Sequence, residues 1–236
     1  MTFSAQDILA QVITTVGPLI LAIGVHEWAH VAMARFLGDP TGEQRGRLTL
    51  NPLAHVDPLW TVGLPIYFVV TSALAGGSAM PFFGAGKPAP YNPTKLTRTF
   101  GGKRISMSLG ELLVAAAGPL SNLALALLIT LVLVVLVRGG HPLDVDVPNS
   151  PSLLAFKFIA MNVSLFVFNL VPVPPLDGSK ILFNALPRAV AAQAMAVTER
   201  LSWVLLILLF VGGSVVLAPI QRVIVGGLLY VVAALT

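Results

Sequence analysis

Apolar residues dominate this chain in long runs, which short polar, glycine-rich and proline-rich segments separate. A helix needs about 20 mostly apolar residues to cross a membrane. Five runs fit this pattern, namely Ile8–Phe36, Ser106–Val137, Ser152–Val171, Leu201–Leu217 and Val223–Ala234. The sequence therefore predicts an all-α integral membrane protein, a polytopic helix bundle of about five or six membrane segments.

The region that follows the first predicted helix is less regular. In "GRLTLNP" apolar and polar positions alternate, which predicts a short strand around Arg47–Leu50. The apolar run Leu59–Met80 is interrupted by glycine and proline, as is typical of a broken segment covered by protein or water. We therefore expect a small β-hairpin or re-entrant element after the first helix.

The placement of charge predicts the orientation of the bundle. The loop at 81–104 carries five lysines and arginines and no acidic residue, whereas the loop at 139–151 carries two aspartates. The positive-inside rule places the first loop in the cytoplasm and the second outside. If Leu59–Met80 enters and leaves on one side, the end of the first helix also faces the cytoplasm, and we favour this arrangement over a simple crossing.

The composition agrees with a membrane protein. Of 236 residues, 56% are hydrophobic and 10% are charged, against about 25% charged residues in soluble domains. This length suits a single membrane domain over residues 1–236. Because the net charge of +4 lies mostly in one loop, it indicates orientation and no nucleic-acid partner. The N-terminal "MTFSAQDILAQ" lacks signal-peptide features, so we expect the first apolar segment to be retained.

The first predicted helix contains ionisable residues in apolar surroundings. His26-Glu27-Trp28-Ala29-His30 has the form H-E-x-x-H, which on a helix places the two histidines on one face, one turn apart. Such a pair can bind one Zn²⁺ ion, while the glutamate can act as a general base on a water molecule. The alternative is a pair of buried histidines bonded to carbonyl groups. The chain has no cysteine, so any metal must be bound by histidine and carboxylate.

Asp177 in "PPLDG" is the best candidate for a third ligand, because catalytic zinc takes three protein ligands and leaves one position open. The preceding prolines end the helix before it and let the carboxylate project sideways. Alternatively, Asp177 caps the helix that follows.

Three motifs occur together in the order of a known family. They are "HEWAH" at 26–30, "AGPLSN" at 117–122 and "NLVPVPPLDG" at 169–178. Over about residues 8–185 the chain resembles the site-2 proteases, which are intramembrane zinc metalloproteases, and "FGAGKPAPYNP" is similar to a compact bacterial branch without a PDZ domain. That branch often has F-G-W-A-K-P, from which Ala85–Gly86 departs. Residues 196–236 would then be accessory membrane helices.

The resemblance implies a role for each motif residue. His26, His30 and Asp177 would bind zinc, and Glu27 would be the catalytic base. Asn122 and Asn169 would lie near the substrate or behind the ligands, although capping or packing explains Asn122 equally well. His55 could stabilise an oxyanion or bind Asp57, and a purely structural role is also open.

The predicted function is hydrolysis of peptide bonds in or near transmembrane segments by a zinc-activated water. The substrate would be a transmembrane protein or peptide in the lipid bilayer, and the predicted strand at Arg47–Leu50 could pair with it once it is unwound. The location would be the cell membrane, with the active site toward the cytoplasm. The alternatives are a catalytically silent relative that binds membrane proteins, and a metal transporter.

Overall fold

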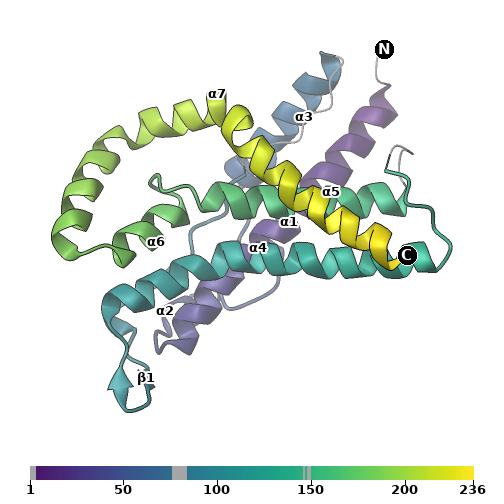
Figure 1. The fold of residues 1–236 in the computed structure, drawn as a ribbon. Coiled ribbons are helices and arrows are strands. Elements are labelled where there is room, and N and C mark those ends of the chain that lie inside the picture. The colour runs from purple at the N-terminus through teal and green to yellow at the C-terminus, as the bar shows by residue number, and fades with distance from the viewer. Residues whose placement is uncertain (1–3, 76–83, 146, 148–149) are drawn as a thin grey trace.

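The computed structural model describes residues 4–75, 84–145, 147 and 150–236. The described helices are α1 (Ala5–Phe36), α2 (Thr41–Gln44), α3 (Leu64–Leu74), α4 (Met107–Arg138), α5 (Pro151–Asn169), α6 (Asp177–Ala185) and α7 (Arg188–Leu235). Short helical turns are η1 (Pro52–Ala54), η2 (Pro58–Gly63) and η3 (Pro93–Lys95), and the strands are β1 (Thr99–Phe100) and β2 (Lys103–Arg104). The predicted helical bundle is confirmed (Figure 1).

Five helical segments among the described residues are long and apolar enough to cross a membrane. They are Ala5–Phe36, Met107–Arg138, Pro151–Asn169, Arg188–Leu209 and Val215–Leu235. The chain is therefore a multi-pass membrane protein, as predicted. The first three of these segments begin after a serine, and each serine hydroxyl accepts a hydrogen bond from a backbone N–H of the first turn.

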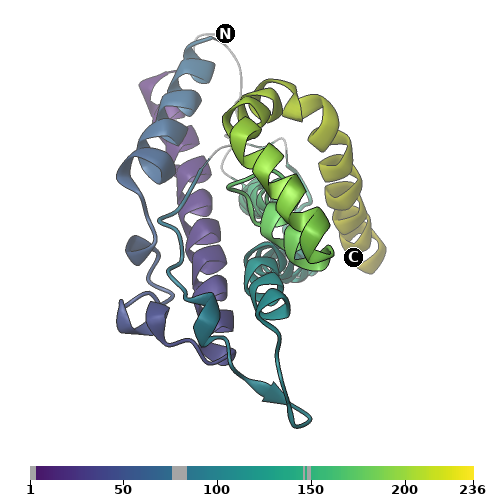
Figure 2. The same cartoon turned by 90° about the vertical axis from the view of Figure 1, so that its left-hand side faces the viewer.

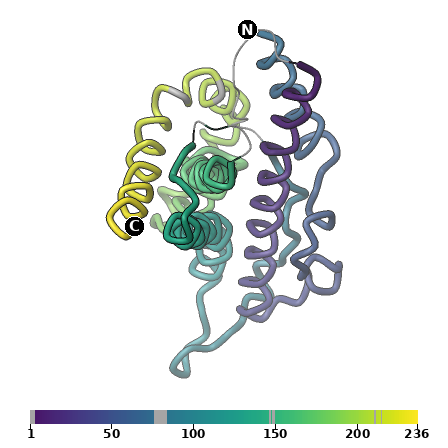
Figure 3. The backbone as a smooth tube through the Cα atoms, turned by 90° about the vertical axis from the view of Figure 1, so that its right-hand side faces the viewer, coloured from purple at the N-terminus to yellow at the C-terminus, as the bar shows by residue number. Residues whose placement is uncertain are grey.

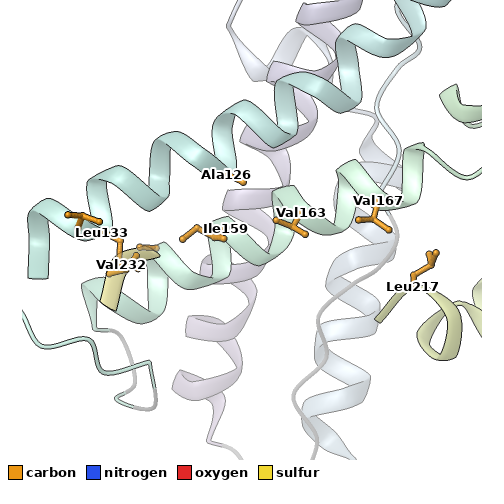
Figure 4. Close-up of a cluster of buried hydrophobic side chains, with 9 residues drawn as sticks. Ala126, Leu133, Ile159, Val163, Val167, Leu217 and Val232 are labelled. Carbon is orange, nitrogen blue, oxygen red and sulfur yellow. The ribbon is translucent and has the colours of Figure 1, made fainter. Parts of the chain in front are cut away.

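Helices α4 and α5 form the centre of the bundle. Figures 2 and 3 show them nearly end-on between α1 and the C-terminal half of α7. Their shared core is a cluster of buried aliphatic side chains that α7 completes, including Leu133, Ile159, Val163, Leu217 and Val232 (Figure 4). A second buried cluster joins Leu19 and Ile23 of α1 to Met161 of α5, so the motif residues of the packed helices have fixed positions relative to α1.

The segment after α1 returns to the end of α1 from which it leaves. Helix α3 lies beside α1 and reaches toward the N-terminus (Figure 2). The chain then comes back as an extended segment, and the backbone N–H groups of Thr97 and Arg98 donate to the carbonyl of Leu37 at 2.9 and 3.0 Å. The end of α1 and the start of α4 are therefore on the same side, as the re-entrant arrangement predicts. The last part of the predicted run, at 76–80, lies outside the described residues.

The predicted strand at Arg47–Leu50 is wrong. These residues form bends, and the Arg47 guanidinium donates to the carbonyl of Ala54 within the same loop. No strand of the described residues lies next to them, so the alternating pattern has no partner for a ladder. The hairpin of the described residues is β1–β2 instead, and Gly101 and Gly102 form its turn with φ values of 56° and 79°, which favour glycine.

The two predicted C-terminal segments are parts of one helix. Helix α7 is continuous from Arg188 to Leu235, and it arcs so that its two halves run in different directions (Figure 1). A pair of glycines at 212–213 and Pro219 lie within it. Glycine and proline weaken the hydrogen bonds of a helix and allow it to bend. The apolar pattern is therefore interrupted at these residues although the helix continues through them.

Candidate metal centre

His26 and His30 meet on one face of α1. Both side chains are buried, and their rings contact edge to face with centroids 4.7 Å apart. The two Nε2 atoms lie 3.1 Å from each other. The i, i+4 spacing of the motif therefore brings two imidazoles to one point inside the bundle, as the sequence predicts.

Asp177 reaches this point from the start of α6. Its Oδ2 atom lies 3.1 Å from Nε2 of His26 and 3.2 Å from Nε2 of His30. The carboxylate makes no capping hydrogen bond to α6, so the capping alternative does not apply. The neighbouring Gly178 lies so close to the end of α5 that a Cβ atom would be 2.3 Å from the carbonyl oxygen of Leu170. Because Gly178 has no side chain, the start of α6 can lie this close to the end of α5, and this position directs the Asp177 carboxylate toward the two histidines.

Hydrogen bonds fix the form of both imidazoles. Nδ1 of His30 lies 2.7 Å from the carbonyl oxygen of Val114, which can only accept, so this nitrogen carries a proton. Nδ1 of His26 lies 2.7 Å from Oδ1 of Asn122 and donates to it. Because both Nδ1 atoms are donors, neutral imidazoles direct their Nε2 lone pairs toward Asp177.

Asn122 is oriented by two further bonds. Its Nδ2 atom donates to the carbonyl of Ala22 at 3.2 Å and to Oδ1 of Asn162 at 3.0 Å, and both asparagines are fully buried. The amide group must therefore turn its oxygen toward His26. Of the two interpretations of Asn122, this geometry favours the one in which its side chain supports a metal ligand, His26. Asn162 was not singled out by its sequence, and a buried asparagine in an apolar helix is the signal that could have identified it.

The three converging atoms fit a metal ion. Lone pairs at separations of 3.1–3.2 Å repel one another unless a proton or a cation lies between them. Tetrahedral zinc, with ligand distances of about 2.0–2.1 Å, separates its ligand atoms by about 3.3–3.4 Å. Two imidazoles and one carboxylate also make up a typical set of ligands for catalytic zinc. The donor set and its spacing both suit Zn²⁺.

The electrostatics keep the third ligand ionised. Burial favours the neutral acid, but hydrogen bonds from Nε2–H of protonated His26 and His30 and the charge of these rings outweigh it and hold the pKa of Asp177 well below its usual range. A bound cation would take the place of these protons between the neutral imidazoles and the carboxylate. A carboxylate binds a metal in its ionised form. Asp177 is therefore ready to bind a cation at neutral pH.

A cleft of about 530 Å³ opens beside these atoms. Glu27 lines it next to His26 but is not one of the three converging groups, which agrees with its predicted separate role. Gly86, from the extended segment, packs over Glu27, and a Cβ atom at this position would lie 3.0 Å from Cγ of Glu27. Tyr91 also lines the cleft, and burial together with the nearby carboxylates of Glu111 and Asp177 raises its pKa to about 12.

Gly118 is a site residue whose importance the sequence did not reveal. It lies in the "AGPLSN" motif of α4, directly against the two imidazoles. A Cβ atom on Gly118 would lie 2.3 Å from Nε2 of His30 and 2.7 Å from Cε1 of His26. The space beside the converging nitrogens therefore exists because this residue has no side chain.

The remaining candidates lie in different surroundings. Asn169 lines the cleft, and its Nδ2 atom donates to the carbonyl of Leu165 on its own helix at 3.0 Å. His55 is buried away from the cleft lining, with Nε2 2.9 Å from the carbonyl oxygen of Thr49. Asp57 accepts from backbone N–H groups of η2 and makes no bond to His55. The structure thus favours the structural reading of His55 and does not bring it to the three ligand atoms.

Replacing Asn122 by alanine is expected to weaken zinc binding by about 10–100-fold, because His26 loses the acceptor that fixes its tautomer. Competition with a zinc-chelating dye measures this affinity, and the melting temperature of the metal-free variant reports its folding. Asn184→Ala is the control, since within the described part of the chain the Asn184 amide bonds only to the carbonyl of Lys180 on α6. Unchanged zinc affinity in Asn122→Ala, or an equal loss in the control, would contradict the assigned role.

Comparisons with known proteins match a peptidase family and proteins named as zinc metalloproteases. The sequence profile of Peptidase family M50 matches residues 146–211. The chain is 36% identical over 203 residues to a Bacillus subtilis protein whose provisional name is zinc metalloprotease YwhC, covering 85% of this chain and 82% of that protein. It is 31% identical to the provisionally named zinc metalloprotease Rip2 of Mycobacterium tuberculosis, covering 81% of this chain and 64% of Rip2. No solved structure matches the chain at a significant level.

Proposed function

Because this chain belongs to peptidase family M50 and is a zinc metalloprotease, we propose that it hydrolyses peptide bonds within or next to the transmembrane segments of other proteins. The observation that carries this proposal is the convergence of His26, His30 and Asp177 at 3.1–3.2 Å between apolar helices of a multi-pass membrane protein. Ionisable residues between membrane-spanning helices mark functional sites, which supports chemistry on a membrane-embedded substrate.

We assign the metal-binding role to His26, His30 and Asp177 and the base to Glu27. A bound zinc ion would polarise the scissile carbonyl and make a water molecule more acidic. Glu27, half-buried in the cleft wall, accepts the proton of the attacking water and then donates it to the leaving amine. Asn122 acts through His26, which it holds in one tautomer and orientation.

The extended segment at 84–91 provides a backbone edge along the cleft. Its outer side is bound: Lys87 N–H donates to the carbonyl of His55 at 2.8 Å, and the Thr61 hydroxyl donates to the carbonyl of Ala85 at 2.6 Å. Gly86 lies between these anchors, and it lines the cleft together with Ala89. We propose that an unwound substrate pairs with this edge, which takes the place of the predicted strand at Arg47–Leu50.

The location and partners follow from the same proposal. The loop with five basic residues lies at the end of the bundle where α1 ends and α4 begins, so the positive-inside rule puts the metal centre toward the cytoplasmic side of the cell membrane. The substrate is a transmembrane protein or peptide. A silent relative would have lost a ligand or the base, and a transporter would line several helices with polar groups. The intact set at one buried point favours the protease.

The test is to map cleavage in single-span membrane substrates after reconstitution of the full chain in vesicles. We expect cuts within the spanning segment or next to it, loss of cleavage after treatment with a zinc chelator, and recovery when zinc is added. Mass spectrometry of the fragments locates the cuts, and a soluble unfolded protein is the control substrate. Cleavage of the soluble protein alone would contradict the intramembrane part of the proposal, and cleavage that persists without zinc would contradict the assigned metal chemistry.

A further inference from the structure

The β1–β2 hairpin and its flanks form a basic surface at one end of the molecule. The described residues 84–110 contain five basic and no acidic side chains. The basic residues are Lys87, Lys95, Arg98, Lys103 and Arg104, all of them exposed. None of them forms an ion pair within the described part of the chain. The hairpin projects beyond the ends of α1 and α4 (Figures 1 and 2), so this charge is open to a partner.

Aromatic side chains lie next to these charges. The guanidinium of Arg98 is 3.9 Å from the ring centroid of Phe36 and 5.8 Å from that of Phe100. The two rings are 48% and 49% exposed. Arg98 also donates to the carbonyl of Phe36 at 2.7 Å, so cation and ring are held in place together. Phenylalanine rings beside lysine and arginine are typical of surfaces that bury apolar groups at the boundary between headgroups and acyl chains.

We propose that this basic hairpin surface, made of Phe36, Lys95, Arg98, Phe100, Lys103 and Arg104, binds the headgroups of anionic phospholipids. Its position supports a lipid partner, because Arg98 and Phe100 contact Phe36, the last residue of α1, and α1 is long enough to span the bilayer. The hairpin therefore lies where headgroups are found. Each exposed lysine or arginine there attracts anionic lipid, and the rings sit among the headgroups and upper acyl chains.

The basic hairpin surface is continuous with the wall of the cleft. The N–H groups of Thr97 and Arg98 bind the end of α1, and the same segment leads back through Tyr91 to Gly86 above Glu27. Lipid bound at the hairpin would restrain the anchored end of this segment. The binding itself does not depend on the proposed protease activity, so it can be tested separately.

Binding is tested with the purified full chain in an uncharged detergent, by native mass spectrometry with dioctanoyl phosphatidylglycerol and dioctanoyl phosphatidylcholine. We expect phosphatidylglycerol to bind about tenfold or more tightly than phosphatidylcholine. The variant K95Q/K103Q/R104Q should lose most of this preference, and added salt should weaken it in the native chain. The variant R188Q/R200Q/R222Q removes the same charge from exposed positions on α7 and should keep the preference.

Several results would overturn the proposal. Equal binding of the two lipids, or equal loss in both triple variants, would show that the hairpin does not select anionic lipid. Binding of glycerol 3-phosphate as tight as that of phosphatidylglycerol would indicate a site for a free phosphate compound. Tighter binding of a polyglutamate peptide than of phosphatidylglycerol would indicate a protein partner.

Discussion

Replacing Glu27 by glutamine is expected to lower kcat by about 10²–10⁴-fold while leaving one zinc ion bound per molecule. Glutamine keeps the size of the side chain and its packing against Gly86, but its amide does not accept a proton from water. His26, His30 and Asp177 supply all three converging atoms, so zinc binding should not depend on Glu27. Metal analysis and single-turnover cleavage on the same preparation measure the two quantities.

Glu111→Gln is the matched control for this variant. Glu111 is a half-buried glutamate near the start of α4 that does not line the cleft. Cleavage by Glu111→Gln should remain within a fewfold of the native rate. Near-native cleavage by Glu27→Gln would place the base on another residue, and loss of zinc from Glu27→Gln would make Glu27 part of the metal site.

The central features of the site were predictable because each depends on local geometry. A helical period brings His26 and His30 together without any knowledge of the fold, and prolines before Asp177 end a helix in any context. The pairing of these two segments across about 150 positions is not local. The sequence indicated it because Asp177 was the best candidate carboxylate, and the family resemblance supported it. In the structure the pairing depends on the packing of α1 against α4 and α5.

The features that the sequence did not predict depend on neighbours that are distant along the chain. Asn162 gains its role because it meets Asn122 from another helix. The alternating pattern at Arg47–Leu50 forms no strand because no partner lies beside it, whereas the glycine turn at 101–102 forms a hairpin with almost no alternation. Strand formation needs a partner as well as a pattern, so short alternating runs predict it poorly.

Replacing Gly118 by alanine is expected to weaken zinc binding by about 100-fold or more. Helix propensity alone favours alanine over glycine by about 1 kcal/mol, so a purely local view predicts a more stable α4. The added methyl group would instead lie 2.3 Å from Nε2 of His30, the atom that must face the metal. The ring of His30 cannot easily turn away, because its Nδ1 atom is bonded to the carbonyl of Val114, which lies on α4 together with Gly118. Zinc affinity should therefore fall although the helix propensity of alanine favours the substitution.

Gly17→Ala separates the steric effect from propensity. Gly17 lies within α1, and a Cβ atom there would have no neighbour within 4 Å, so this variant should bind zinc normally and melt at the native temperature or above. Zinc affinity by dye competition and the melting temperature of the metal-free protein are measured for both variants. If Gly118→Ala bound zinc as tightly as Gly17→Ala, the imidazoles would have room that this structure does not give them. A loss confined to Gly118→Ala would show that the missing side chain on α4 is part of the metal centre.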